Sequence, residues 1–383
     1  MKRKQKIKGI ALLCVMVMLL SGCGSVNGPD QAAQEPVPSP GITLWMQKDA
    51  PIGDGLAALI ERYNSTAPDS IVSLEFFESE DAMREALAGG RPDLLLCTQE
   101  QMQTLDEAGA LCALAFDAEN MPQYLAPFTE PEAVRNLRYV PLCASLPVLV
   151  CREESRALYE QSATLEDLFA AFDDAAAQQG KPVLAIDDCA VLFAAALAQR
   201  GERFSAELEL EKAGEAYREI YNLLADAVFD GALLLQEERD ALALVEHGVI
   251  DCALCTSSAL AALDSANLSV LPVPPMAGCQ KLEEAEIWGL AVMTTPERLV
   301  DAAAFVGWLC QFDLTAKIAI PQGLIPVVHG KWERDETGLS ADFCRVADAC
   351  DIFLKPGGEA ERAMREQFEH ALYEVLAALE EPW

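Results

Sequence analysis

The sequence predicts an α/β protein with two domains. Strands and helices alternate between residues 42 and 97 in the order βαβαβ, which favours a parallel sheet with right-handed crossovers. A second series of strands and helices follows an apolar stretch at residues 139–151. About 360 residues remain once an N-terminal signal is set aside, which is more than one ordinary hydrophobic core holds.

Residues 1–22 are typical of a lipoprotein signal peptide. Five basic residues among the first eight precede an apolar run from Ile10 to Leu20. That run is too short to span a bilayer, which takes about 20 residues in a helix. The tetrad Leu20-Ser21-Gly22-Cys23 resembles the lipobox of bacterial lipoproteins. The resemblance implies cleavage before Cys23, lipid on its thiol and anchoring on the extracytoplasmic face of the cell membrane.

Residues 23–40 are rich in Pro, Gly and Ser and predict a flexible tether. The first domain then opens with strands at residues 42–45, 71–77 and 94–97. Apolar residues at helical spacing after the first strand predict the first helix. They are Leu56, Leu59, Ile60 and Tyr63. A second helix, at residues 81–87, ends at Gly89-Gly90.

The second domain opens at Thr164-Leu-Glu-Asp167, a capping box that begins a helix. Hydrophobic runs predict strands, and apolar stripes predict helices, in the rest of the chain. The strands are 181–186, 249–256, 268–273 and 287–293, and the helices are near 212–229, 237–246 and 297–311. A last helix carries one apolar stripe that includes Phe368 and Leu372.

The net charge and the cysteine content limit the kinds of ligand and site that the sequence allows. The formal net charge of −33 disfavours nucleic acid as a partner and favours neutral or cationic ligands. Of 13 cysteines, Cys14 leaves with the signal and Cys23 takes lipid, so an odd, scattered set remains, which predicts buried, reduced thiols. Cys252 and Cys255 lie in a predicted strand, where residues three apart point to opposite faces. The two thiols are therefore expected to be buried separately and not to act as a pair. The sequence predicts no metal site and no cofactor.

Several segments resemble, in order, those of the extracellular solute-binding proteins of ABC importers, in the class that includes oligosaccharide binders. The segments are ITLW with ERYNSTAP, EALAGGRPDLLLC, EAGALCAL, RYVPLCASLPVLVC, SATLEDLFAAF, HGVIDCALCTSSAL, EIWGLAVMTTPERLVDAAAFVGWL and QGLIPV. The resemblance covers about residues 42–330. It implies two lobes joined by crossing strands, with a ligand cleft between them.

By that resemblance, the first lobe spans residues 41–141 and 288–322, and the second spans 145–285 and 327–383. The implied protein is a monomeric receptor that delivers a small polar solute, foremost a carbohydrate, to an ABC permease. A polyamine is an alternative solute, and a sensor or adhesin without transport is an alternative function. No G-x-S-x-G, H-E-x-x-H or Walker motif supports a secreted enzyme.

Six residues at strand ends and crossings are candidate ligand contacts, because ligands gather beyond the carboxyl ends of parallel strands. They are Asp49, Glu100, Ser145, Asp187, Ser257 and Trp288. The first five also have ordinary structural explanations as turn residues, helix starts or helix caps. Trp288 either stacks on a ligand or packs between lobes.

Overall fold

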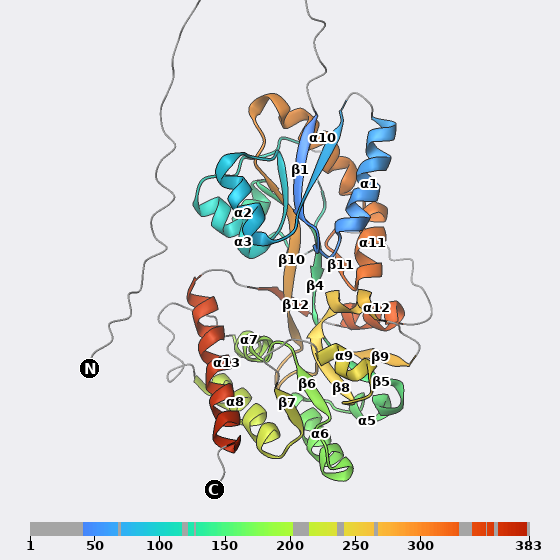
Figure 1. Cartoon of the computed structure of the whole chain (residues 1–383), viewed down its shortest axis with the longest axis vertical. Coiled ribbons are helices and arrows are strands. Elements are labelled where there is room, and N and C mark those ends of the chain that lie inside the picture. Colours follow the sequence, from blue (N-terminus) through green and yellow to red (C-terminus); the bar gives the residue numbers. More distant parts are fainter. Residues whose placement is uncertain are drawn as a thin grey trace, which may run out of the picture.

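The protein is described from a computed structural model. The description covers residues 41–67, 70–116, 122–125, 128–201, 214–235, 241–263, 267–328, 339–349, 351–355 and 359–380. The predicted signal peptide (1–22), Cys23 and the tether (23–40) lie outside these residues. The described chain forms two α/β lobes, one above the other in Figure 1.

The first lobe is built on a sheet with the strand order β11-β4-β10-β3-β1-β2, and β12 also pairs with β10. Its strands are β1 (Ile42–Gln47), β2 (Val72–Phe77), β3 (Leu94–Thr98), β4 (Tyr139–Ser145), β10 (Leu282–Val292), β11 (Ile325–Pro326) and β12 (Asp351–Leu354). As predicted, β1 runs parallel to β2 and β3. The predicted strand 287–293 is part of the longer β10, which lies between β3 and β4 and runs antiparallel to both.

Helices cover both faces of this sheet. They are α1 (Gly53–Thr66), α2 (Glu80–Gly89), α3 (Gln99–Glu107), α4 (Glu132–Arg135), α10 (Leu299–Leu309) and α11 (Phe312–Ala319). The predicted stripe of α1 is buried in one core cluster with α10 and α11, where Tyr63 meets Phe305 edge to face at 5.1 Å. Met83 of α2 and Met102 of α3 belong to a different cluster, around Trp45. The predicted helix 297–311 is a 3-10 turn (Pro296–Arg298) followed by α10.

A buried aspartate, Asp93, joins several segments at the end of the first sheet that lies away from the second lobe. Asp93, 3% exposed, accepts hydrogen bonds from Thr43 N (2.8 Å), Thr294 Oγ1 (2.7 Å) and Arg298 Nη1 (3.0 Å). Burial alone would raise the pKa of the Asp93 carboxyl, but these donors outweigh it and lower the pKa. The role of this carboxylate in the fold is therefore to join β1, β3 and the start of α10 through charge-assisted bonds.

The second lobe has a sheet with the order β7-β6-β8-β5-β9. Its strands are β5 (Pro147–Arg152), β6 (Leu184–Ile186), β7 (Leu233–Leu235), β8 (Cys252–Thr256) and β9 (Leu268–Leu271). Strand β6 is parallel to β7 and β8, and β5 is antiparallel to β8 and β9. The predicted strands 181–186 and 249–256 are shorter than expected; Gly248, with φ of +70°, lies in the turn that precedes β8.

The helices of the second lobe begin with α5 (Arg156–Tyr159) and α6, whose predicted capping box is present. Helix α6 spans Leu165–Gln179, and the others are α7 (Ala190–Gln199), α8 (Gly214–Phe229), α9 (Ala241–Glu246), α12 (Leu339–Ala349) and α13 (Glu359–Glu380). The predicted helix 237–246 begins at Ala241 within the described residues. Helix α12 packs on β9, and α13 packs on α8 and α7 through buried Phe368 and Leu372.

Strands β4, β10 and β12 run between the lobes (Figure 1). Strand β4 ends at Ser145 and β5 begins at Pro147, so the buried Leu146 is the single residue between the two sheets. Strand β10 pairs with β12 up to Ala285 and with β4 from Glu286 onward. It bulges between Trp288 and Gly289. A Cβ on Gly289 would lie 2.7 Å from the Tyr139 ring, so only glycine fits there.

The described cysteines are all free, and most are buried: Cys97, Cys112, Cys143, Cys151, Cys189, Cys252, Cys255, Cys279, Cys310 and Cys344. This confirms the prediction of mostly buried, free thiols for that set, in which Cys112 and Cys279 are only partly buried, while Cys350 lies outside the described residues. Cys252 and Cys255 belong to different core clusters, as their spacing in a strand predicted. Among the described helices, none alone is long and apolar enough to cross a membrane; one bent pair, 296–309 with 313–322, passes by composition, and α10 in it is a core helix.

Candidate functional site

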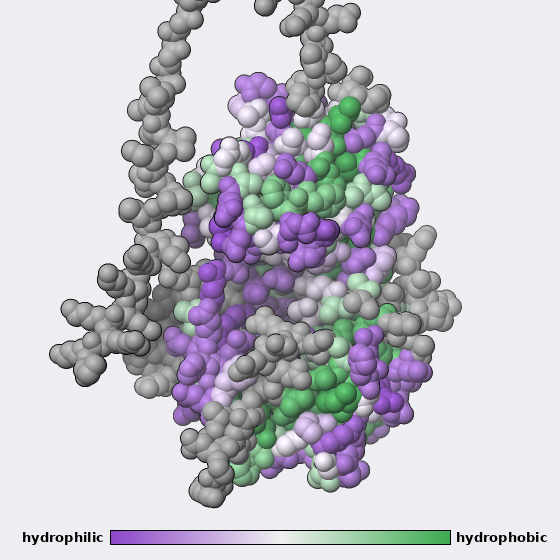
Figure 2. Space-filling model, viewed as in Figure 1, coloured by the Kyte–Doolittle hydropathy of each residue, from purple (hydrophilic) through white to green (hydrophobic). Residues whose placement is uncertain are grey.

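The carboxyl ends of the parallel strands in both lobes face the space between them. In the first lobe, β1 leads into Asp49 and β3 leads into α3. In the second lobe, β6 leads into Asp187 and β8 ends at Thr256. Figure 2 shows hydrophilic residues around the hollow between the lobes. This is the position at which open α/β sheets bind ligands.

Two predicted residues, Asp49 and Glu100, lie at this edge of the first lobe. Asp49 is exposed in the turn after β1. Glu100 lies in the first turn of α3, which Thr98 begins with a capping box to Gln101. Its carboxylate forms an ion pair with Arg362 of α13. The acidic side chain in the first turn also interacts favourably with the helix dipole.

Two others, Ser145 and Trp288, share one face of the crossing strands with Glu286. Ser145 pairs with Glu286 between β4 and β10, and Trp288 pairs with Cys143 of β4. The Ser145 side chain is 2% exposed and its Oγ has no hydrogen-bond partner in the structure. Trp288 is half-buried against the core of the first lobe. A ligand at this face would meet an aromatic ring and a carboxylate.

The remaining two predicted residues use their side chains to hold the second lobe together. Asp187 Oδ1 accepts a hydrogen bond from the Ala241 amide at 3.0 Å and so caps the start of α9. Ser257 is fully buried; its Oγ accepts from Leu146 N at 3.0 Å, and its amide donates to Leu146 O at 2.7 Å. Both therefore have the structural roles that their positions in the sequence also allowed.

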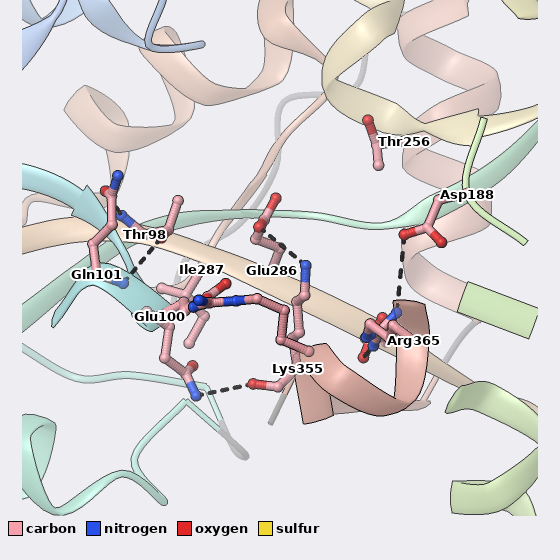
Figure 3. A network of polar contacts seen from close by, with 12 residues as sticks. Thr98, Glu100, Gln101, Asp188, Thr256, Glu286, Ile287, Lys355 and Arg365 are labelled. Atoms are coloured by element: carbon pink, nitrogen blue, oxygen red, sulfur yellow. Dashed lines mark hydrogen bonds and ion pairs between the residues drawn. The ribbon is translucent and has the colours of Figure 1, made fainter. Parts of the chain in front are cut away.

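Two cations from the C-terminal segment (residues 351–355 and 359–380) lie beside carboxylates at the cleft, and they were not predicted from the sequence. Figure 3 shows Lys355 beside Glu286, with 3.6 Å between Nζ and Oε1, and Arg365 beside Asp188, with 3.9 Å between Nη1 and Oδ2. Arg365 also forms an ion pair with Glu284. The Lys355 carbonyl accepts a hydrogen bond from Gln99 Nε2 at 3.1 Å. In the sequence, Arg365 belongs to a helical pattern of charged residues that equally suits a solvated face.

Cationic side chains offset part of the negative charge at the edge of the cleft, although the whole chain is strongly acidic. Each of the carboxylates Glu100, Asp188 and Glu286 has a cationic neighbour from the C-terminal segment. Carboxylates and guanidinium groups are strong hydrogen-bonding groups with fixed geometry. A neutral, hydroxyl-rich solute can form hydrogen bonds with such groups.

A further carboxyl group is buried at the base of the crossing. Glu283 of β10 is 2% exposed and its Oε2 has no hydrogen-bond partner in the structure. Burial raises the pKa of Glu283 to about 8, so the group is protonated at neutral pH. A neutral carboxyl at this position avoids the cost of a buried charge beside the crossing.

The described residues do not gather three or more His, Cys, Asp or Glu side chains in a way that could hold a metal ion. Burial raises the pKa of the Cys97, Cys151 and Cys310 thiols to about 12, so these thiols are not nucleophilic at neutral pH.

Comparison with known proteins identifies the family. Residues 58–335, well over half of the chain, match the family described as bacterial extracellular solute-binding protein. No curated protein sequence matches the chain. Many solved structures share its fold, and those most similar to it include sugar-binding proteins from several bacteria.

The cyclic alpha-maltosyl-1,6-maltose binding protein of Arthrobacter globiformis is 18% identical, with 88% of this chain and 95% of that chain covered and a TM-score of 0.69. Maltose-bound MalE3 of T. maritima is 15% identical, with 88% and 95% covered and a TM-score of 0.69. The substrate-binding protein Lmo0181 of Listeria monocytogenes, in complex with cycloalternan, is 16% identical, with 87% and 94% covered and a TM-score of 0.68. The two-lobed fold and the sequence match lead to one conclusion: the chain belongs to the bacterial extracellular solute-binding protein family.

Proposed function

We propose that this protein is a monomeric, lipid-anchored receptor that binds one small carbohydrate between its lobes and delivers it to an ABC permease. The observation that carries the proposal is the meeting of strand carboxyl ends from both lobes around a hydrophilic hollow. The proposed bounds of the lobes are those expected from the sequence, 41–141 with 288–322 and 145–285 with 327–383. A cleft between two sheets can exclude water around a solute and then open to release it.

Carbohydrate is the favoured solute for two reasons. The structural neighbours include proteins that bind maltose, cyclic maltosyl-maltose, cycloalternan and raffinose. The cleft itself joins paired charges to a half-buried aromatic ring, Trp288. Sugars present hydroxyl groups to polar side chains and an apolar face to an aromatic ring.

Anchoring follows from the Leu20-Ser21-Gly22-Cys23 tetrad. Lipid on Cys23 and the tether of residues 23–40 would keep the receptor at the outer face of the membrane while the lobes remain free to meet a permease. The proposed protein does no chemistry on its solute, in agreement with a family of binding proteins. Coupling to a permease separates this proposal from a sensor or adhesin.

The test is a thermal-shift screen of the mature protein against maltose, raffinose, cyclic glucans, spermidine and putrescine. A ligand at about 100 times its Kd adds about 2.7 kcal/mol, which raises Tm measurably. Calorimetry with the best sugar should give a single site, and Glu286→Gln should weaken it, while Glu61→Gln on the exposed face of α1 should not. A shift with polyamines alone would refute the carbohydrate assignment, and turnover of the ligand would refute the receptor.

The partner is tested in membrane vesicles that carry a candidate ABC permease from the same organism. Added receptor should drive ATP-dependent uptake of the bound sugar. Binding of the sugar without any stimulated uptake would contradict delivery to a permease and would favour a sensor.

A further inference from the structure

The C-terminal segment, residues 351–355 and 359–380, contacts both lobes. Its helix α13 packs against α8 and α7 and so belongs to the second lobe. Its strand β12 pairs with the crossing strand β10. Yet two of its residues, Lys355 and Arg362, contact the first turn of α3 in the first lobe.

The first link is an ion pair between two helix ends. Glu100 in the first turn of α3 and Arg362 in the first turn of α13 are in direct contact, and their side chains are 37% and 59% exposed. The positive end of the helix dipole favours Glu100 but disfavours Arg362. Contact with Glu100 offsets that cost, so each lobe stabilises the charge of the other.

The second link lies one residue away on α3. Gln99 Nε2 donates to the Lys355 carbonyl at 3.1 Å, and the Lys355 amide donates to the Ala285 carbonyl of β10 at 2.9 Å. The Lys355 ammonium is 3.6 Å from the Glu286 carboxylate. Lys355 is therefore held on the crossing strand while it accepts a hydrogen bond from the first lobe.

We propose that Arg362 of α13 and Glu100 of α3 form an interlobe latch, and that this latch holds the lobes together before any solute binds. Hinge opening moves the first turn of α3 away from α13, so it must break the ion pair between Glu100 and Arg362. The latch thereby sets the fraction of closed receptor in the absence of ligand. The inference concerns the ligand-free protein and does not rest on the proposed carbohydrate.

The exposure of the Glu100 and Arg362 side chains sets the expected size of the effect. A largely exposed ion pair contributes little, so loss of the Arg362 charge should lower the ratio of closed to open protein by about two- to fivefold. High salt should lower the same ratio in the wild type, because screening acts on exposed charges.

The experiment measures that ratio by single-molecule energy transfer in the ligand-free mature protein. Dyes are attached to azido residues at the exposed positions Glu85 on α2 and Glu366 on α13, so that the native thiols stay unlabelled. The variants are Arg362→Gln, Glu100→Gln, the double variant, and the charge swap Glu100→Arg with Arg362→Glu. The matched control is Arg345→Gln, whose side chain is also 59% exposed and pairs with Asp342 inside one helix.

The latch predicts that both single variants lose closed protein to the same extent, that the double variant loses no more than either, and that the charge swap recovers part of the loss. Arg345→Gln should match the wild type. A ligand-free wild type that is fully open, an Arg362→Gln variant indistinguishable from Arg345→Gln, or additive effects in the double variant would each overturn the latch. Failure of every sugar to bind would overturn the proposed function and leave these results unaffected.

Discussion

Gly323 offers the sharpest test of how closely the lobes approach behind the cleft. It follows the 3-10 turn Ile320–Gln322, and its φ of +65° is in the left-handed region. A Cβ built there would lie 1.9 Å from the carbonyl oxygen of Ser257 in the second lobe. Substitution by alanine therefore combines a backbone cost with a steric clash between lobes.

The two costs can be separated with a second glycine. Gly180 ends α6 with φ of +68°, and a Cβ there would have nothing within 4 Å. Gly180→Ala should cost about 1–2 kcal/mol, the left-handed penalty alone. Gly323→Ala should cost a further 1–3 kcal/mol, because the Ser257 backbone must move by more than 1 Å to restore an ordinary contact, as in an overpacked core.

The assay is urea unfolding followed by tryptophan fluorescence, with the two variants compared at the same slope m. Movement of Ser257 also disturbs its hydrogen bonds to Leu146 at 2.7 and 3.0 Å, so small-angle scattering of Gly323→Ala should show a larger radius of gyration. Equal losses of stability in Gly180→Ala and Gly323→Ala would refute the close approach of the two lobes at this point.

Other expectations address the remaining features. Asp93→Asn should lose about 2–4 kcal/mol of unfolding free energy at pH 7, and the difference from wild type should shrink as pH falls through the lowered pKa of the folded carboxyl. For Glu283 the pH dependence has the opposite sign. Because its pKa is raised to about 8 in the folded state, the unfolding free energy of the wild type should fall as pH rises from about 4.5 to 8. Urea titrations of Glu283→Gln should not show that loss of stability. Trp288→Ala should weaken the sugar found by screening by about 1 kcal/mol or more in calorimetry, and unchanged affinity would place the ring outside the site. Cys23→Ser should leave an uncleaved precursor without lipid; a mature N-terminus elsewhere in mass spectra of the native protein would exclude the lipoprotein signal.

The sequence predicted the local structure of the first lobe because local patterns determine it. The stripe of Leu56, Leu59, Ile60 and Tyr63 is the buried face of α1, and the order of β1, β2 and β3 indicated the parallel pairs. The segment order also indicated the family correctly. Each of these features depends on spacing within a few tens of residues, which a single sequence displays.

Long-range features were not visible in the same way. Strand β10 is longer than predicted because residues 282–285 pair with β12, a strand that sequence reasoning missed. The six predicted ligand contacts remain a prediction, and the structure places them in different environments. Glu100, Ser145 and Trp288 lie among the polar groups of the crossing, whereas Asp187 and Ser257 use their side chains on backbone amides of the second lobe. A strand-end acid looks the same in sequence whether it caps a helix or faces a cleft.

The position of β10 also has a consequence for the order in which the chain can fold. This strand separates β3 from β4, with Gly289 opposite Cys97 and Pro141, so the first sheet lacks its central strand until residue 292 has been synthesised. Strands β3 and β4 therefore keep unpaired edges while most of the second lobe is being synthesised. Loop closure over so many residues is slow. We therefore expect the second lobe to gain amide protection first in pulse-labelled refolding, and the first lobe to follow as a separate, slower phase.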